Sequence, residues 1–410
     1  MDALLGGWED SLRGVAESTI TKQSSHMRKW RAFLDYVGIN DEWLDRFRPE
    51  QRQRIVGAFA KKIRNNKFGK TKKKTLKCCT IRATISNVST TFRLNGKKDP
   101  RLDDHNQKCI ALQRQLNGYE DADPNVKNQL PIPIHVLKNM LSSATGELET
   151  ATAELLSGAT FFGMRSCEYL NVGNDSNKLV DPDEPSNERR TIPLRLSDLR
   201  FFHNNMEITN RRLLSQADFV QITFRFQKNK NKFESINQFR ANDPSFCPVL
   251  IWARIKQRIL SYRNTSDESF VYVFEVSGRL YDVTSAHARS LLRHYVKLDD
   301  PLGLQYDLSR IGTHSIRVTL VMVLHTAGAG NRYIMGIGRW KSKAFQKYLR
   351  QDMPDFNKGI STLIASSKAT FLCAPSKTPV LPHLHSFLCP DNGLHTDSFQ
   401  SAPQTIYQWI

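Results

Sequence analysis

The stretch THSIRVTLVMVLHTAG, residues 313–328, sets a polar pair at the start of a strongly apolar run. His314 and Arg317 are three positions apart, so on a helix they share one face, while the apolar residues after them supply a buried face. A histidine and an arginine at this spacing also occur together by chance. The pair predicts a polar site at the mouth of a buried helix, and the rest of the chain must identify that site.

The charge of the chain indicates a polyanionic partner. Its 410 residues include 59 Lys or Arg and 40 Asp or Glu, which gives a net charge of +19 and a pI near 9.7. For such a chain nucleic acid is the commonest polyanion. Residues 61–82, KKIRNNKFGKTKKKTLKCCTIR, are rich in Lys and Arg and contain no acid. A solvated loop or a nuclear-import signal is the alternative interpretation of this run. The residues expected to bind DNA phosphates are Lys70, Lys72, Lys73, Lys74, Lys77 and Arg82.

Membrane, secretory and metal-binding classes are disfavoured by the sequence. No window approaches eighteen uninterrupted apolar residues, and the first residues carry acids rather than a basic start followed by an apolar stretch. The seven cysteines are scattered and include no C-x-x-C pair, which favours reduced thiols inside a cell. We expect no metal, because the most metal-like group matches no common zinc spacing. That group is Cys373, His383, His385, Cys389 and His395.

Residues 1–122 are predicted to form a helical N-terminal domain. Apolar side chains recur at helical spacing in SSHMRKWRAFLDYV, residues 24–37, with Ser24 or Ser25 available as the N-cap. Further helices are expected over residues 52–63 and 77–95.

A domain boundary is predicted at residues 123–134, where prolines and asparagines disfavour a helix. Residues 135–368 then mix helix and strand, and residues 369–410 are expected to be a flexible tail. Period-two alternation in DFVQITFRFQ, residues 218–227, predicts a half-buried strand, which a KNKNK turn connects to a partner strand. Strands are also expected over residues 194–202 and 233–240.

Polar residues of the second domain occur in a distinctive order along the chain. An arginine and a glutamate follow an apolar helical run, lysines occupy the hairpin turn, and the histidine and arginine of THSIR come next. The segment IGRWKSKAFQKYLR, residues 337–350, then supplies a tryptophan and a tyrosine. The ordered set is Arg165, Glu168, then Lys228, Lys230 and Lys232, then His314, Arg317, Trp340 and Tyr348.

This order resembles that of the tyrosine recombinases, the phage-integrase family, and the segment 337–350 is similar to the crypton branch of eukaryotic mobile elements. The resemblance covers nearly all of the second domain and, more faintly, the helical domain. It implies a mainly α fold with a small β-hairpin or sheet. A helical core-binding domain and a mixed α+β catalytic domain would form a two-domain, C-shaped clamp on double-stranded DNA. It also implies a homotetramer on two DNA sites, no cofactor, and a nuclear location, or a cytoplasmic one with the DNA if the host is not eukaryotic.

The resemblance also implies roles for these residues. Tyr348 would attack the scissile phosphate and form a 3′-phosphotyrosyl bond. Arg165 and Arg317 would bind the two non-bridging oxygens with their forked donors. His314 would act as general base or hold the phosphate, and Glu168 would orient Arg165 and His314.

Two assignments within the set stay open. Lys228 is favoured as the acid that protonates the leaving oxygen, because it directly follows the strand, but Lys230 and Lys232 are alternatives and are also expected to bind DNA. Counting forward from the histidine places Trp340 at the second hydrogen-bonding position, whereas counting back from the tyrosine places Arg339 there. We favour Trp340, whose indole N–H can donate to a phosphate.

The predicted function is a site-specific DNA recombinase or integrase of a mobile element. A type IB topoisomerase is an alternative, because it shares the tyrosine chemistry but relaxes supercoils without joining two duplexes. A domesticated DNA-binding protein that keeps the fold without cutting DNA is a second alternative.

Overall fold

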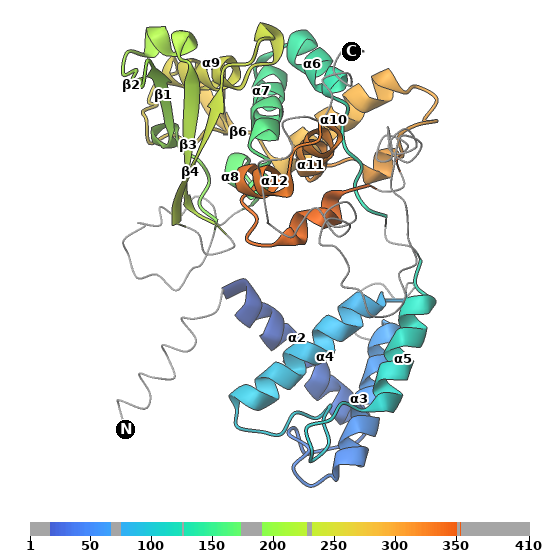
Figure 1. Ribbon diagram of the computed structural model, residues 1–410. Coiled ribbons are helices and arrows are strands. Elements are labelled where there is room, and N and C mark those ends of the chain that lie inside the picture. Colours follow the sequence, from blue (N-terminus) through green and yellow to red (C-terminus); the bar gives the residue numbers. More distant parts are fainter. Residues whose placement is uncertain are drawn as a thin grey trace, which may run out of the picture. The chain divides into compact units, whose positions relative to one another are not determined.

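The structure is a computed structural model of the chain, and it describes residues 17–66, 75–124, 127–173, 191–227, 232–350 and 353. Over these residues the fold is mainly α with small antiparallel sheets, as the sequence predicts (Figure 1). The helices and strands are organised around separate hydrophobic cores.

The first core is formed by four of the described helices. Trp30 is fully buried, and its ring meets Phe59 and Phe92 edge to face at centroid distances of 5.0 and 5.9 Å. These three aromatic side chains come from three different helices, so the cluster joins the helices into one unit. The helices are α2 (Glu17–Tyr36), α3 (Pro49–Arg64), α4 (Cys78–Leu94) and α5 (Ile110–Asp121).

The start of α2 corrects one prediction. The helix begins at Glu17, so Ser24 and Ser25 lie inside it and do not act as its N-cap. The reason is local, since residues 17–23 contain neither Gly nor Pro and nothing in them stops the helix. The predicted start of the next helix, residue 52, is closer to the observed one. Helix α3 begins with Pro49, whose fixed φ suits the first turn of a helix.

The second core is built around α7 (Glu147–Phe161). Residues 151–160 are all buried, and α7 contacts helices on several sides, namely α6, α9, α10 and α11. Gly158 permits the close approach of α9, because a Cβ at this position would lie 2.9 Å from the ring of Trp252. The other helices are α6 (Ile134–Ser143), α8 (Ser166–Tyr169), α9 (Pro248–Leu260), α10 (Ser285–Asp299), α11 (Ser315–Thr326) and α12 (Asn331–Gly338).

An antiparallel sheet packs against this core with the strand order β2-β1-β3-β4 (Figure 1). As the alternating pattern predicts, Val220, Ile222 and Phe224 of β3 are buried, while the residues between them are partly exposed. A short hairpin, β5 (Val273–Val276) with β6 (Arg279–Asp282), was not predicted. The strands of the larger sheet are β1 (Leu199–His203), β2 (Met206–Glu207), β3 (Phe219–Phe226) and β4 (Lys232–Phe239).

The domain limits given above stay predictions, as does the clamp shape. The described residues between Asp121 and Ile134 form no helix or strand, in keeping with their prolines. None of the described helices combines the length and apolar character that crossing a bilayer requires. The described residues also contain no group of three or more acidic, His or Cys side chains suited to hold a metal ion. The Cys and His group of the predicted tail lies outside the described residues.

Replacing Trp30 with alanine tests the first core. Because the ring is fully buried and also donates its Nε1–H to the carbonyl of Glu42 at 3.0 Å, we expect W30A to lower the free energy of unfolding by about 3–5 kcal/mol. Urea denaturation followed by circular dichroism measures this change. The matched control is Ile110→Ala, since the Ile110 side chain is 66% exposed and its loss should change stability by less than about 0.5 kcal/mol. Equal losses in the two variants would contradict this account of the core.

Candidate active site

Arg317 lies on the first turn of α11 and is deeply buried, at 1% exposed. Its apolar neighbours Ile316, Val318 and Val321 are fully buried, which draws the whole turn into the protein. Two terminal nitrogens of the guanidinium donate to backbone carbonyls: Nη1 to Gly163, and Nη2 to Gly338 at 3.1 Å. The Arg317 Nε–H is buried and has no acceptor within the described part of the chain.

Arg165 and Glu168 lie at the start of the short helix α8 and within it, respectively. Arg165 is its N-cap residue, and Glu168, at the third helical position, folds back to accept the Arg165 backbone N–H at 2.8 Å. The Arg165 side chain donates from Nη1 to Glu168 Oε1 at 2.9 Å and stays 22% exposed. The glutamate is fully buried, so it fixes the arginine while leaving part of the guanidinium accessible. The side-chain hydrogen bonds of Glu168 within the described residues are to Arg165 and Arg339, and its role in orienting His314 stays a prediction.

Tyr348 and Trp340 bring aromatic rings to the same place. Tyr348 ends the 3₁₀ helix η5 (Lys343–Tyr348), which the buried Phe345 anchors against α11 and α12. The Tyr348 ring centroid lies 5.5 Å from that of Trp340 and 5.0 Å from that of His314. The guanidinium carbon of Arg317 lies 4.4 Å from the Trp340 centroid and 5.8 Å from the Tyr348 centroid. Residues from α11, η5 and the turn before η5 therefore converge.

The electrostatics of this cluster favour an anion. Burial, and then the positive charge of Arg165, lower the pKa of Arg317 to about 10, so the group stays protonated at neutral pH. Desolvation, followed by the charges of Arg317, Arg350 and Arg165, lowers the pKa of His314 below its ordinary value. Its imidazole is therefore largely neutral at pH 7 and can accept a proton from a nearby phenol.

The surroundings of Arg339 differ from those of Trp340, the other candidate for the second hydrogen-bonding position. The Arg339 side chain is fully buried and donates to Gln227, Phe162 and Glu168. Trp340 instead packs beside Tyr348, with the two rings tilted by 47°, and beside Arg317. The geometry thus places Trp340, and not Arg339, next to the phenol of Tyr348.

Several predicted residues are not brought into this cluster or lie outside the described residues. Lys232 is the first residue of β4, and its Nζ lies 6.0 Å from the Phe226 ring centroid. Lys77 precedes α4 and is exposed. Arg82 donates to Glu120 at 2.8 Å and to Asn117 at 2.9 Å, so its charge is partly balanced within the protein. The predicted residues outside the described part are Lys70, Lys72, Lys73, Lys74, Lys228 and Lys230.

Two glycines complete the site, and the sequence did not single them out. Gly163 and Gly338 supply the carbonyls that hold Arg317. Gly163 has φ +51°, and a Cβ there would meet the Leu320 side chain at 2.5 Å. At Gly338 a Cβ would lie 1.6 Å from the ring of Trp340. Only glycine allows the indole to pack directly on the backbone at this point.

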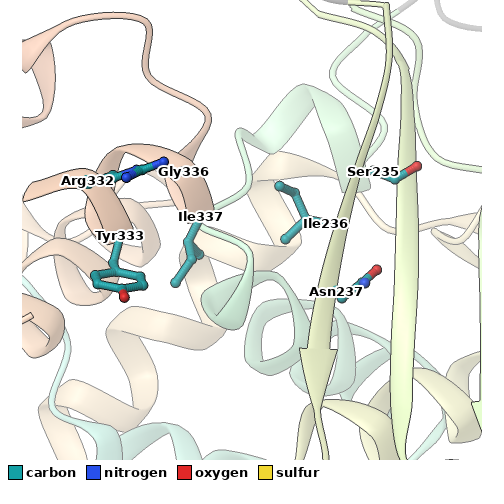
Figure 2. Close-up of a pocket in the computed structure, with 7 residues that line it drawn as sticks. All are labelled: Ser235, Ile236, Asn237, Arg332, Tyr333, Gly336 and Ile337. Atoms are coloured by element: carbon teal, nitrogen blue, oxygen red, sulfur yellow. The ribbon is translucent and has the colours of Figure 1, made fainter.

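A groove in the second core's surface is lined by none of the predicted site residues. It has a volume of about 630 Å³ and lies between β4 and α12, with residues of the strand on one side and of the helix on the other (Figure 2). The lining residues are Ser235, Ile236, Asn237, Arg332, Tyr333, Gly336 and Ile337.

Replacing Gly338 with alanine tests the packing of Trp340. The new methyl group would overlap the indole, so we expect the ring to move off Arg317 and the free energy of unfolding to fall by about 1–3 kcal/mol. Urea denaturation measures the loss, and acrylamide quenching of tryptophan fluorescence reports the exposed ring. Gly336→Ala on the same helix is the control, because a Cβ there meets nothing within 4 Å. If the two variants behave alike, Trp340 does not pack on Gly338.

Comparisons with known proteins identify similar folds but no close relative. No family model matches the chain, and no curated protein is similar to it. Among solved structures, the Tn1549 transposon integrase in complex with transposon right end DNA has 12% sequence identity and a TM-score of 0.49, covering 88% of this chain and 98% of that chain. XerH recombinase bound to difH substrate has 13% identity and a TM-score of 0.44, over 82% and 75% of the two chains. A lambda integrase dimer bound to a core site has 13% identity and a TM-score of 0.43, over 84% and 94%. At these identities and TM-scores the similarities do not by themselves assign the chain to a family.

Proposed function

We propose that this chain is a tyrosine-type DNA recombinase that cuts and rejoins DNA strands. The observation that supports this most strongly is the convergence of Tyr348, His314 and Trp340 on the guanidinium of Arg317. A phenol beside a buried cation and a neutral imidazole supplies a nucleophile, an anion-binding group and a proton acceptor in one place. Attack on a phosphodiester requires these three functions.

The proposed reaction is a transesterification. The Tyr348 hydroxyl oxygen attacks phosphorus, its proton passes to His314, and the bond between phosphorus and the 5′ oxygen breaks. The products are a 3′-phosphotyrosyl bond and a free 5′ hydroxyl, and a second 5′ hydroxyl reverses the step to reseal a strand. Arg165 and Arg317 bind the non-bridging oxygens as charge builds on them. Because the covalent bond retains the energy of the broken diester, the reaction consumes no cofactor.

The remaining roles follow the predictions from the sequence. Lys228 protonates the leaving 5′ oxygen, and Trp340 donates its indole N–H to the phosphate. Glu168 acts through Arg165, to which it is bonded. The bonds of Arg339 to three other groups of the protein support Trp340 for this role.

We further propose the biological setting that the sequence resemblance implies. The substrate is double-stranded DNA, in keeping with a net charge of +19. The active assembly is a homotetramer on two DNA sites, and the protein acts in the integration of a crypton-like mobile element in the nucleus.

Covalent capture of DNA tests the proposed nucleophile. We expect the full chain to form a denaturant-resistant adduct with members of a library of nicked duplexes with random sequence, because loss of the short fragment beyond the nick prevents resealing. Tyr348→Phe should abolish the adduct, since it removes only the attacking oxygen. The control is Tyr333→Phe, a tyrosine of α12 that is 71% exposed and should leave capture unchanged. Adducts are measured by gel electrophoresis under denaturing conditions and by sequencing.

The outcomes of this experiment also separate the alternatives. An adduct that persists in Y348F means that the nucleophile is a different residue. Relaxation of a supercoiled plasmid without any recombinant product favours topoisomerase activity. DNA binding without any adduct in the wild-type chain indicates a binding protein that does not cut.

Neutralising the lysine cluster tests the nonspecific contribution to DNA binding. Replacing Lys72, Lys73 and Lys74 with glutamine should weaken binding to all sequences alike and reduce the slope of log K against log salt by roughly 2.7, at about 0.9 for each phosphate contact. Fluorescence anisotropy over a salt series measures the slope. Arg82→Gln should change it much less, because Arg82 is already paired with Glu120. Affinity lost for one sequence alone would argue against this role.

A further inference from the structure

Arg339 occupies an unusual place in the candidate site. Its side chain is fully buried and donates hydrogen bonds to three different segments of the chain. Nε donates to Gln227 Oε1 at 2.9 Å, Nη1 to the carbonyl of Phe162 at 3.1 Å, and Nη2 to Glu168 Oε2 at 2.6 Å. The guanidinium carbon also lies 3.5 Å from the Phe224 ring centroid.

The backbone conformation of Arg339 indicates that contacts of its side chain hold the residue in place. The residue ends α12 in the left-handed conformation, with φ 56° and ψ 45°. Glycine is the residue that adopts this conformation with least strain and is the common choice directly after a helix. An arginine at such a position is retained only where its surroundings hold it there. Here those surroundings are the acceptors and the ring that receive the guanidinium.

We propose that Arg339 is a positioning residue of the strand-transfer site, which it aligns without contacting DNA. This inference rests on the proposed function. One planar guanidinium fixes the turn after α7, the helix α8 and the end of β3 relative to one another, because each of its three nitrogens donates to a different segment. A lysine has a single nitrogen on a flexible stem and cannot reproduce this geometry.

Each segment held by Arg339 carries a group of the site. Glu168 is shared, since the same carboxylate that receives Arg339 also holds the side chain of Arg165. Phe162 precedes Gly163, whose carbonyl receives the guanidinium of Arg317. A shift of Arg339 therefore moves the partners of both arginines that are proposed to bind the phosphate.

Arg339 also influences its neighbour Trp340 and the β3–β4 hairpin. The next residue is Trp340, whose direction is set by the left-handed turn at Arg339. Gln227 directly follows β3 and donates in turn to Glu234 of β4 at 2.8 Å. The hydrogen bond from Arg339 to Gln227 thus ties the β3–β4 hairpin to the turn that presents the indole.

The test is Arg339→Lys, which keeps a positive charge beside Glu168 but loses the three separate guanidinium donors. We expect the rate constant for adduct formation in single turnover to fall about 100-fold, the loss typical of a misplaced reacting group, while the Kd for DNA stays within twofold. Gln227→Ala removes one acceptor of Arg339 and should lower the same rate constant by about 10-fold. Hydrogen exchange measured by mass spectrometry should accelerate in peptides covering residues 162–170 and 219–227 and nowhere else.

Arg258→Lys is the matched control. Arg258 is also a largely buried guanidinium that bridges a carboxylate, a side-chain oxygen and a backbone carbonyl, at Glu154, Tyr262 and Val273, away from the candidate site. Its replacement should affect exchange around α9 but leave the rate of adduct formation within twofold of the wild type.

The outcomes distinguish this inference from the proposed function. If the wild-type chain forms no adduct at all, the proposed function is wrong and the positioning role falls with it. If the wild type reacts and R339K reacts as fast, the positioning role alone is overturned. If R339K and R258K slow the reaction equally, or R339K accelerates exchange throughout the second core, Arg339 serves stability only.

Discussion

The buried ion pair between Glu168 and Arg339 is the constraint on which the rest of the candidate site depends. Their side chains are 1% and 0% exposed, so neither charge is stabilised by water. Removing one partner from such a pair costs about 3–5 kcal/mol, because the other charge is left uncompensated. The pair is therefore stable only while the turn after α7, the helix α8 and the end of α12 stay together. The presentation of Arg165, Arg317 and Trp340 follows from that arrangement.

The sequence predicted those features of the candidate site that depend on the residues close by in the chain. Tyr348 lies on a short helical turn, and Arg317 lies at the start of a buried helix, because both positions follow from the apolar residues around them. The strand over residues 219–226 was predicted for a similar reason, since alternation specifies which face is buried whatever the partner strand is. The order of residues predicted that His314 and Tyr348 belong to one site. The distance of 5.0 Å between their ring centroids comes from the fold alone.

The features that could not be predicted depend on contacts between distant segments. Counting residues left Arg339 as an alternative to the favoured Trp340, and the hydrogen bonds of Arg339 to Glu168 and Gln227 could not be foreseen from spacing. The carbonyls of Gly163 and Gly338 carry no signal in the sequence, because every residue has a carbonyl and only the fold directs these two at Arg317. For the same reason the partner of Arg82 across α4 and α5 was missed, and with it the partial neutralisation of a predicted DNA contact.

The charge balance of the cluster links its stability to its proposed chemistry. Three guanidinium groups, those of Arg165, Arg317 and Arg339, lie around the carboxylate of Glu168. Arg339 and Arg165 donate hydrogen bonds to that carboxylate directly, whereas within the described residues Arg317 contacts two neutral carbonyls and two aromatic rings. Carbonyl dipoles and ring faces stabilise a buried cation less than an anion does, which is why burial and the charge of Arg165 lower its pKa. An incoming phosphate would supply the missing negative charge to Arg317, whose guanidinium carbon lies 5.8 Å from the Tyr348 ring centroid.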